Sequence, residues 1–126
     1  MKASFFAMTT ILLLAICCQS GFAQDAVKLL SASDYKIKLA QDSTIQLVDV
    51  RTPDEFATGH IEGAMNINYW GDDFETAIQK LDKKRPVLLY CKSGVRSNKA
   101  AAVMQKLGFI ELYNLEGGYL TWKTDK

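Results

Sequence analysis

The chain has 126 residues, of which 48% are hydrophobic and 23% are charged, and its formal net charge is +1. This length accommodates one domain with a single aliphatic core. The balanced charge excludes the general basic field that binding to nucleic acid or to an anionic membrane surface requires. No internal repeat, low-complexity tract or linker divides the sequence.

The N-terminal segment has the pattern of a secretory signal peptide. Lys2 precedes an apolar run over 5–18, and small and polar residues follow up to Ala23, a suitable cleavage site. We therefore expect a signal peptide over 1–23 and a mature domain over 24–126. The protein would then be periplasmic or secreted, with no stable membrane insertion after cleavage. An uncleaved N-terminal anchor is the alternative, although the apolar run is short for a membrane span.

The three cysteines divide between the expected signal peptide and the mature chain. Cys17 and Cys18 lie in the signal peptide; a lipid on one of them is a further alternative, but neither follows a small residue. Cleavage leaves Cys91 as the single thiol, which is either reactive or available for intermolecular pairing. One cysteine and one histidine, His60, cannot supply the usual nitrogen and sulfur ligands of zinc, so we expect no metal site.

Short apolar runs alternate with helical patterns along the mature chain. The runs predict strands over 27–30, 45–50, 64–68, 86–90 and 110–115. Caps and apolar spacing predict five helices. One begins at Ser31 or Ser33, one at Thr52 and one at Tyr119, and the other two cover 74–81 and 98–107. Connections of this kind are too long for hairpins, so the sequence predicts an α/β domain: a parallel sheet of about five strands, covered by helices on both faces.

A polar heptapeptide joins the fourth expected strand to the helix expected over 98–107; it reads Cys91-Lys92-Ser93-Gly94-Val95-Arg96-Ser97. Open α/β sheets bind their ligands at such strand ends. Gly94 allows a tight turn that points backbone N–H groups inward as an anion-binding nest, and Ser97 is a suitable N-cap. The cations of Lys92 and Arg96 and the helix start should lower the pKa of Cys91 until it is a thiolate at neutral pH.

The alternative for Cys91 is a buried, inert thiol, as most free cysteines are. Arg96 argues against it, because a cation at a helix start opposes the helix dipole and so does not serve the helix. Lys92 adds a second cation to the same short loop. The charges therefore favour a reactive, anion-binding cysteine.

The heptapeptide resembles the active-site loop of the rhodanese (thiosulfate sulfurtransferase) family. Three further segments resemble motifs of that family in the same order: 47–51 followed by Glu55-Phe56, 59–67, and 115–118 with Trp122. The resemblance extends from about residue 27 to Trp122. It implies a rhodanese-like fold, a roughly five-stranded parallel sheet with helices on both faces.

The same resemblance implies the chemistry. Cys91 is the nucleophile that takes the outer sulfur of thiosulfate, expels sulfite and carries a persulfide. The loop would hold the persulfide and the donor dianion through Lys92, Ser93, Gly94, Val95 and Arg96, where Lys92 replaces an arginine often found in the family. The sulfur would leave to cyanide, to a small thiol or to an exported redox protein. No cofactor is expected, and nucleic acid is not an expected partner.

Other polar and aromatic residues lie near the expected loop mouth. Asp49 and Arg51 are supporting residues, with a structural ion pair to each other or to Glu55 as their favoured role. His60 is expected to be a structural hydrogen-bonding residue, since an ionised thiolate needs no general base. The large aromatic residues are expected in the core or pocket wall: Trp70, Tyr119 and Trp122.

Two rival functions remain open at this point. A phosphatase of the related Cdc25 type also carries a cysteine loop that ends in arginine, but its loop is longer than the six residues from Cys91 to Arg96. A non-catalytic rhodanese-like binding module is the second rival. Retention of the cysteine and of both loop cations argues against that module.

Overall fold

The structure is a computed structural model that describes residues 27–125. The expected signal peptide over 1–23, its cleavage site and the lipid alternative at Cys17 or Cys18 lie outside the described residues. Within the described range, no helix is both long enough and apolar enough to cross a membrane.

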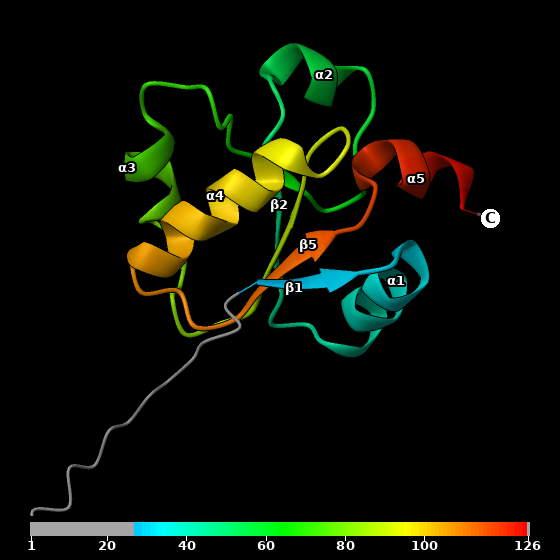
Figure 1. The fold of residues 1–126 in the computed structure, drawn as a ribbon, viewed down its shortest axis with the longest axis horizontal. Coiled ribbons are helices and arrows are strands. Elements are labelled where there is room, and N and C mark those ends of the chain that lie inside the picture. Colours follow the sequence, from blue (N-terminus) through cyan, green and yellow to red (C-terminus); the bar gives the residue numbers. More distant parts are fainter. Residues whose placement is uncertain (1–26, 126) are drawn as a thin grey trace, which may run out of the picture.

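Five strands and five helices alternate along the chain (Figure 1). The strands are β1 (Val27–Leu30), β2 (Gln46–Asp49), β3 (Met65–Asn66), β4 (Val87–Tyr90) and β5 (Leu112–Leu115). The helices are α1 (Ala32–Gln41), α2 (Pro53–Ala57), α3 (Phe74–Ile78), α4 (Val95–Lys106) and α5 (Gly118–Thr124). All strand pairs are parallel, in the order β1-β5-β4-β2-β3. The predicted α/β class, with a five-stranded parallel sheet, is confirmed.

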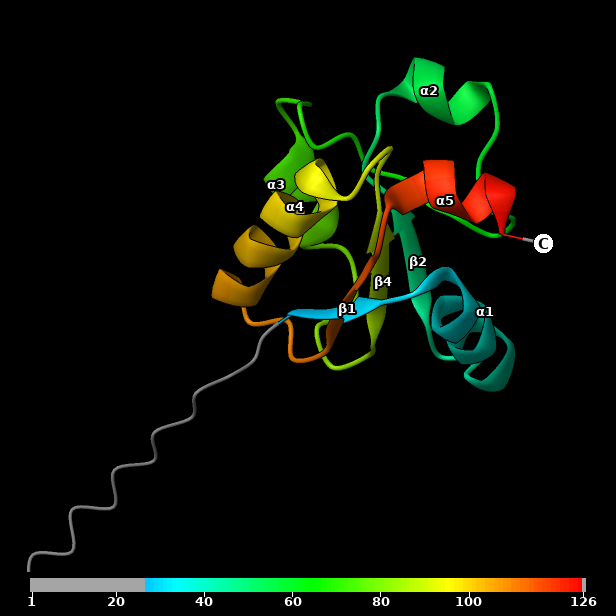
Figure 2. The ribbon, with the colours of Figure 1, turned by 45° about the vertical axis from the view of Figure 1, so that its right-hand side comes forward.

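The sheet is covered on both faces, α3 and α4 lying on one side and α1 and α5 on the other (Figures 1 and 2). The central strand β4 serves both layers because its side chains alternate. Val87 and Leu89 pack in the cluster with α3 and α4, and Leu88 and Tyr90 in the cluster with α1 and α5. Cys91 continues this alternation and lies on the α3 and α4 side.

Local capping explains where several helices begin and end. The Ser31 side chain caps α1, and Thr52 and Glu55 form a reciprocal capping box at the start of α2. At the end of α4, Gly108 has a φ of 98° and the next amide, of Phe109, donates to the carbonyl of Met104 at 3.1 Å. That is the Schellman arrangement expected when glycine follows a helix.

Two helix boundaries differ from the prediction by three residues. Helix α4 begins at Val95 rather than 98, so Ser97 lies inside its first turn and is not the N-cap. Gly94 is the N-cap, and its φ of 105° lets the loop turn directly into the helix. Helix α3 ends at Ile78 rather than 81 and gives way to a turn.

Candidate active site

Cys91 follows directly after β4, at the carboxyl end of the sheet, and its side chain is 1% exposed. The chain turns through Lys92, Ser93 and Gly94 and enters α4 at Val95. The turn brings the Gly94 N–H within 3.0 Å of Cys91 Sγ, to which it donates. The predicted loop therefore encloses the sulfur between the end of a buried strand and the start of a helix.

The surroundings of Cys91 favour its thiolate. Burial raises the pKa of the thiol, but hydrogen bonds from the Ser97 hydroxyl and from the backbone amides of Ser97, Gly94 and Ser93 lower it by more. The net pKa lies below the usual value for cysteine. The lowering of the pKa comes from these hydrogen bonds, whereas the sequence pointed to the cations of Lys92 and Arg96 and to the helix start.

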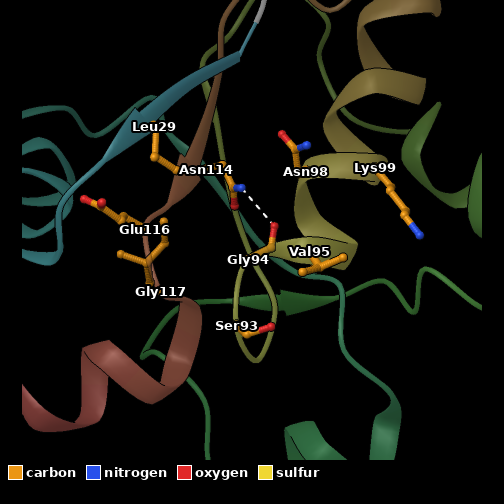
Figure 3. Close-up of a pocket in the computed structure, with 10 residues that line it drawn as sticks. Leu29, Ser93, Gly94, Val95, Asn98, Lys99, Asn114, Glu116 and Gly117 are labelled. Carbon is orange, nitrogen blue, oxygen red and sulfur yellow. Dashed lines mark hydrogen bonds between the residues drawn. The ribbon is translucent and has the colours of Figure 1, made fainter.

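Ser97 and Asn114 form a buried polar pair behind the sulfur. Ser97 Oγ lies 3.3 Å from Cys91 Sγ and 2.6 Å from Asn114 Oδ1. Asn114 Nδ2 donates to the Gly94 carbonyl at 3.1 Å (Figure 3). From the sequence, Ser97 is expected only as an N-cap, and Asn114 has no expected role in the site. The available signal was an amide side chain within an otherwise apolar strand.

Helix α5 fixes the loop from the opposite side. The amides of Tyr119 and Leu120 donate to the carbonyls of Cys91 and Lys92 at 2.8 and 3.2 Å. Gly118 permits this contact, because a Cβ on it would lie 2.5 Å from the Lys92 carbonyl oxygen. The backbone of the loop is thus held between α4 and α5, which leaves its amides in place for an anion.

Arg96 is engaged by a carboxylate. Its Nη1 and Nη2 donate to Glu55 Oε1 and Oε2 at 2.7 and 3.0 Å, and its guanidinium lies 4.5 Å from the ring centroid of Trp70. Hydrogen bonds from Arg96, followed by those from Thr52, lower the pKa of Glu55 to about 2 despite partial burial. Trp70, expected in the core or a pocket wall, is 64% exposed and so does not lie in the core; it covers the guanidinium at the surface.

Asp49 and Arg51 pair with each other, one of the two partnerships expected for them. Arg51 Nε lies 3.0 Å from both Asp49 oxygens, and Nη2 donates to Oδ2 at 2.6 Å. Both side chains are almost wholly buried. Arg51 Nη2 also donates to the Gly59 carbonyl at 2.7 Å, and the guanidinium lies 4.3 Å from the centroid of the Tyr119 ring. The pair therefore ties the end of β2 to the segment after α2 and to α5.

His60 has the structural role that was expected. Its Nδ1 lies 3.0 Å from the Phe56 carbonyl, and because a carbonyl only accepts, Nδ1 carries the proton of this bond. The imidazole is stacked on the Phe56 ring with centroids 3.7 Å apart. Both contacts are within the turn that ends α2.

Two cavities flank the loop. The smaller, of about 200 Å³, is lined by Arg51, Glu55, Thr58, Lys92, Tyr119, Leu120 and Lys123. Lys92 and Lys123 are exposed residues of this lining. The larger, of about 460 Å³, is lined by Ser93 and Gly94 of the loop, by the first turns of α4 and by the end of β5 (Figure 3). The smaller cavity thus brings Lys92 of the loop together with Lys123 of α5 and Arg51.

The structure brings the predicted loop residues together and gives their side chains different surroundings. Cys91 points inward and Lys92 outward, while Arg96 turns toward α2. Among residues 27–125, no group of three or more histidine, cysteine, aspartate or glutamate side chains is arranged to hold a metal ion.

Comparison with known proteins agrees with this geometry. The family model of the rhodanese-like domain matches residues 31–125, which is most of the chain. The chain belongs to the rhodanese-like domain family. Its match includes the Cys91 loop, the Asp49 and Arg51 pair, and α5.

Several known proteins are 33% or more identical to this chain over the residues that align. The uncharacterized protein YqhL of Bacillus subtilis is 38% identical over 80% of this chain and 76% of its own length. The thiosulfate sulfurtransferase GlpE of Shewanella oneidensis is 33% identical over 68% of this chain and 83% of its own. A crystal structure of a rhodanese-like domain protein from Staphylococcus aureus covers 75% of this chain and 90% of its own, with 33% identity and a TM-score of 0.67.

Proposed function

We propose that the protein is a sulfurtransferase that moves a sulfane sulfur from thiosulfate, or from another persulfide donor, to cyanide or a thiol through a persulfide on Cys91. The supporting observation is the sulfur of Cys91 in a ring of hydrogen-bond donors that lower its pKa. Family membership supports sulfur transfer in general, and the likeness to GlpE supports thiosulfate as the donor.

The proposed reaction has two displacement steps. The Cys91 thiolate attacks the outer sulfur of thiosulfate; a new S–S bond forms, the old one breaks, and its electron pair leaves with sulfite. The acceptor then attacks the outer sulfur of the persulfide, and the electron pair returns to Cys91 Sγ. Cyanide would leave as thiocyanate and a thiol as its persulfide. The inward-facing amides stabilise negative charge on the sulfur in both steps.

Lys92 is the loop cation that we assign to the donor anion. It lines the smaller cavity together with Lys123, and both side chains are exposed. The resemblance also assigns Arg96 to the anion, but its guanidinium is already paired with the Glu55 carboxylate. We therefore give Arg96 the weaker share of donor binding and Lys92 the stronger.

The acceptor is proposed to be external. Cys91 is the only cysteine in residues 27–125, so no second thiol there can resolve the persulfide into an internal disulfide. We further propose export to the periplasm or exterior, on the signal-like pattern over 1–23. The acceptor would then be a small thiol, cyanide or an exported redox protein, and fractionation of expressing cells would test the location.

Intact mass spectrometry after incubation with thiosulfate tests the proposal. We expect the wild-type protein to gain one sulfur atom and Cys91→Ser to gain none, because Cys91 is the proposed carrier. Addition of cyanide should remove that sulfur. Absence of the gain would overturn the persulfide mechanism and favour a binding module, and turnover of an aryl phosphate would favour a phosphatase.

A further inference from the structure

The Ser97 hydroxyl has more acceptors than it can serve. Its oxygen lies 3.3 Å from Cys91 Sγ, 2.6 Å from Asn114 Oδ1 and 3.1 Å from the Gly94 carbonyl oxygen. The side chain is completely buried, at 0% exposure. A hydroxyl has a single proton to donate, so these three acceptors compete for it.

The Gly94 carbonyl already has two other donors. The amide of Asn98 donates to it at 3.1 Å, and Asn114 Nδ2 donates to it at 3.1 Å (Figure 3). A carbonyl oxygen has two lone pairs, and these two bonds use both. The choice for the Ser97 proton is therefore between Cys91 Sγ and Asn114 Oδ1.

The orientation of Asn114 is fixed by the same network. Only its nitrogen can donate to the Gly94 carbonyl, so its oxygen must face Ser97 and can only accept. Asn114 is 3% exposed and stands on β5 between two paired neighbours, β1 and β4. The amide cannot turn away without breaking a buried hydrogen bond.

We propose that Asn114 is a positioning residue whose Oδ1 competes with Cys91 Sγ for the Ser97 proton. The hydroxyl can then donate to Sγ when the sulfur is charged and return to Oδ1 when it is not. When Sγ is a thiolate, the hydroxyl donates to sulfur, because a bond to an ionised acceptor is the stronger one. When Sγ carries the second sulfur and the charge lies on that outer atom, the hydroxyl rotates to Asn114 Oδ1. The exchange makes and breaks hydrogen bonds only.

The use of this exchange in catalysis rests on the proposed sulfur transfer, but its effect on Cys91 does not. The sign of each substitution is distinctive. Ser97→Ala removes the donor and should disfavour the thiolate. Asn114→Leu removes the nearer competitor, Oδ1 at 2.6 Å, and should favour it. The same change frees a lone pair of the Gly94 carbonyl, 3.1 Å from Ser97 Oγ, but that neutral acceptor is weaker than a thiolate. In the Ser97→Ala background, Asn114→Leu should have no effect, since no proton remains to compete for.

The test is the pH dependence of alkylation of Cys91 by iodoacetamide in the purified full chain, followed on the peptide that contains Cys91 because Cys17 and Cys18 are thiols too. Below the pKa of the thiol, we expect Ser97→Ala to slow alkylation about tenfold, the order of one hydrogen bond to a charged group. Asn114→Leu should speed it, and the double variant should match Ser97→Ala. Slower alkylation in Asn114→Leu than in the wild type would overturn the proposal. So would a change in rate on Asn114→Leu that is equal in the wild-type and Ser97→Ala backgrounds.

A second measurement avoids any substitution at Asn114, which could fail to fold. In nitrogen-15 spectra, the side-chain amide of Asn114 should shift with the titration of Cys91 in the wild type and much less in Ser97→Ala. After persulfide formation it should stay at its position for the protonated thiol. An amide signal that shifts equally in both proteins would overturn the exchange. Because alkylation and the amide titration need no sulfur transfer, their failure is distinct from failure to form a persulfide.

Discussion

The guanidinium of Arg96 donates to both carboxylate oxygens of Glu55, with Nη1–Oε1 and Nη2–Oε2 distances of 2.7 and 3.0 Å. The pair joins the first turn of α4 to α2. Glu55 also completes the capping box of α2 with Thr52. One carboxylate therefore orders a helix start and holds a cation of the proposed active site.

The Glu55 pair should make stability depend on pH in the acid range. The pKa of Glu55 falls from 4.5 to about 2 in the folded protein. Because the folded pKa is the lower one, the stabilisation is complete above 4.5 and is lost as the pH falls through about 2. Urea unfolding should show Glu55→Gln less stable than wild type at neutral pH, with the difference vanishing near pH 2.

The matched control for this prediction is Glu62→Gln, since Glu62 is an exposed glutamate close to the same helix. It should change stability little at any pH. A stability difference for Glu55→Gln that stayed constant down to pH 2 would mean that the carboxylate charge is not what the pair contributes.

Binding of the donor anion should depend more on Lys92 than on Arg96. Lys92 lines the smaller cavity with an exposed side chain, whereas the Arg96 charge is already matched by Glu55. Lys92→Ala should raise the KM for thiosulfate about tenfold, the order of one charge-assisted hydrogen bond, and added salt should reduce the difference. Steady-state kinetics with cyanide as acceptor would measure both.

Lys99→Ala is the control for general charge, because Lys99 is an exposed lysine of α4 that lines the larger cavity instead. Its KM should stay close to that of the wild type. Equal effects of the two alanine variants would indicate long-range attraction by the whole surface and would remove the specific role of Lys92.

Much of the fold could be predicted from the sequence because strands buried on both faces of a parallel sheet consist of continuous apolar residues. The runs around Leu88 and Leu47 marked the central strand β4 and its neighbour β2, and the change from Tyr90 to Cys91 marked a strand end. Thr52 and Pro53 marked the start of α2 by capping chemistry alone. Each of these signals lies within a few consecutive residues, so it can be recognised without the fold.

The remaining features depend on contacts between distant segments. The start of α4 was misplaced because the φ of Gly94, not the capping ability of Ser97, decides where the helix begins. Arg96 had several acidic residues available, and only the folded chain selects Glu55. Asn114 gains its importance from Ser97 and Gly94, which meet it only when β5 lies beside β4.

The buried pair of Asp49 and Arg51 should be essential to stability. Loss of one partner leaves the other charge buried without compensation, which typically costs about 3–5 kcal/mol. Arg51→Ala and Asp49→Asn should therefore lower the free energy of unfolding in urea by that order. Arg51→Lys should rescue little, because an ammonium cannot reproduce the bonds to both Asp49 oxygens and to the Gly59 carbonyl.

Lys36→Ala is the matched control for a surface pair. Lys36 Nζ lies 2.8 Å from Asp125 Oδ2, but their side chains are 38% and 34% exposed. Pairs of that kind contribute about 0–1 kcal/mol. A loss from Arg51→Ala as small as that from Lys36→Ala would show that water reaches Asp49 once the guanidinium is removed.

The last prediction concerns Gly118, where α5 meets the Cys91 loop. Its φ is 62°, and a Cβ there would lie 2.5 Å from the Lys92 carbonyl oxygen and 2.7 Å from that of Cys91. Both neighbours are backbone atoms, so relief requires moving the loop itself. Gly118→Ala should therefore lower sulfur transfer strongly, by displacing the amides around the sulfur, in addition to destabilising the protein.

Gly63→Ala separates the two effects. Gly63 also has a positive φ, of 84°, but nothing lies within 4 Å of the position of its Cβ. Its substitution should cost about 1–2 kcal/mol of backbone strain and leave sulfur transfer unchanged at a temperature where the variant is folded. Gly118→Ala should lose both stability and activity under the same conditions. If it kept the activity of Gly63→Ala, the contact between α5 and the loop would not be what holds the amides in position.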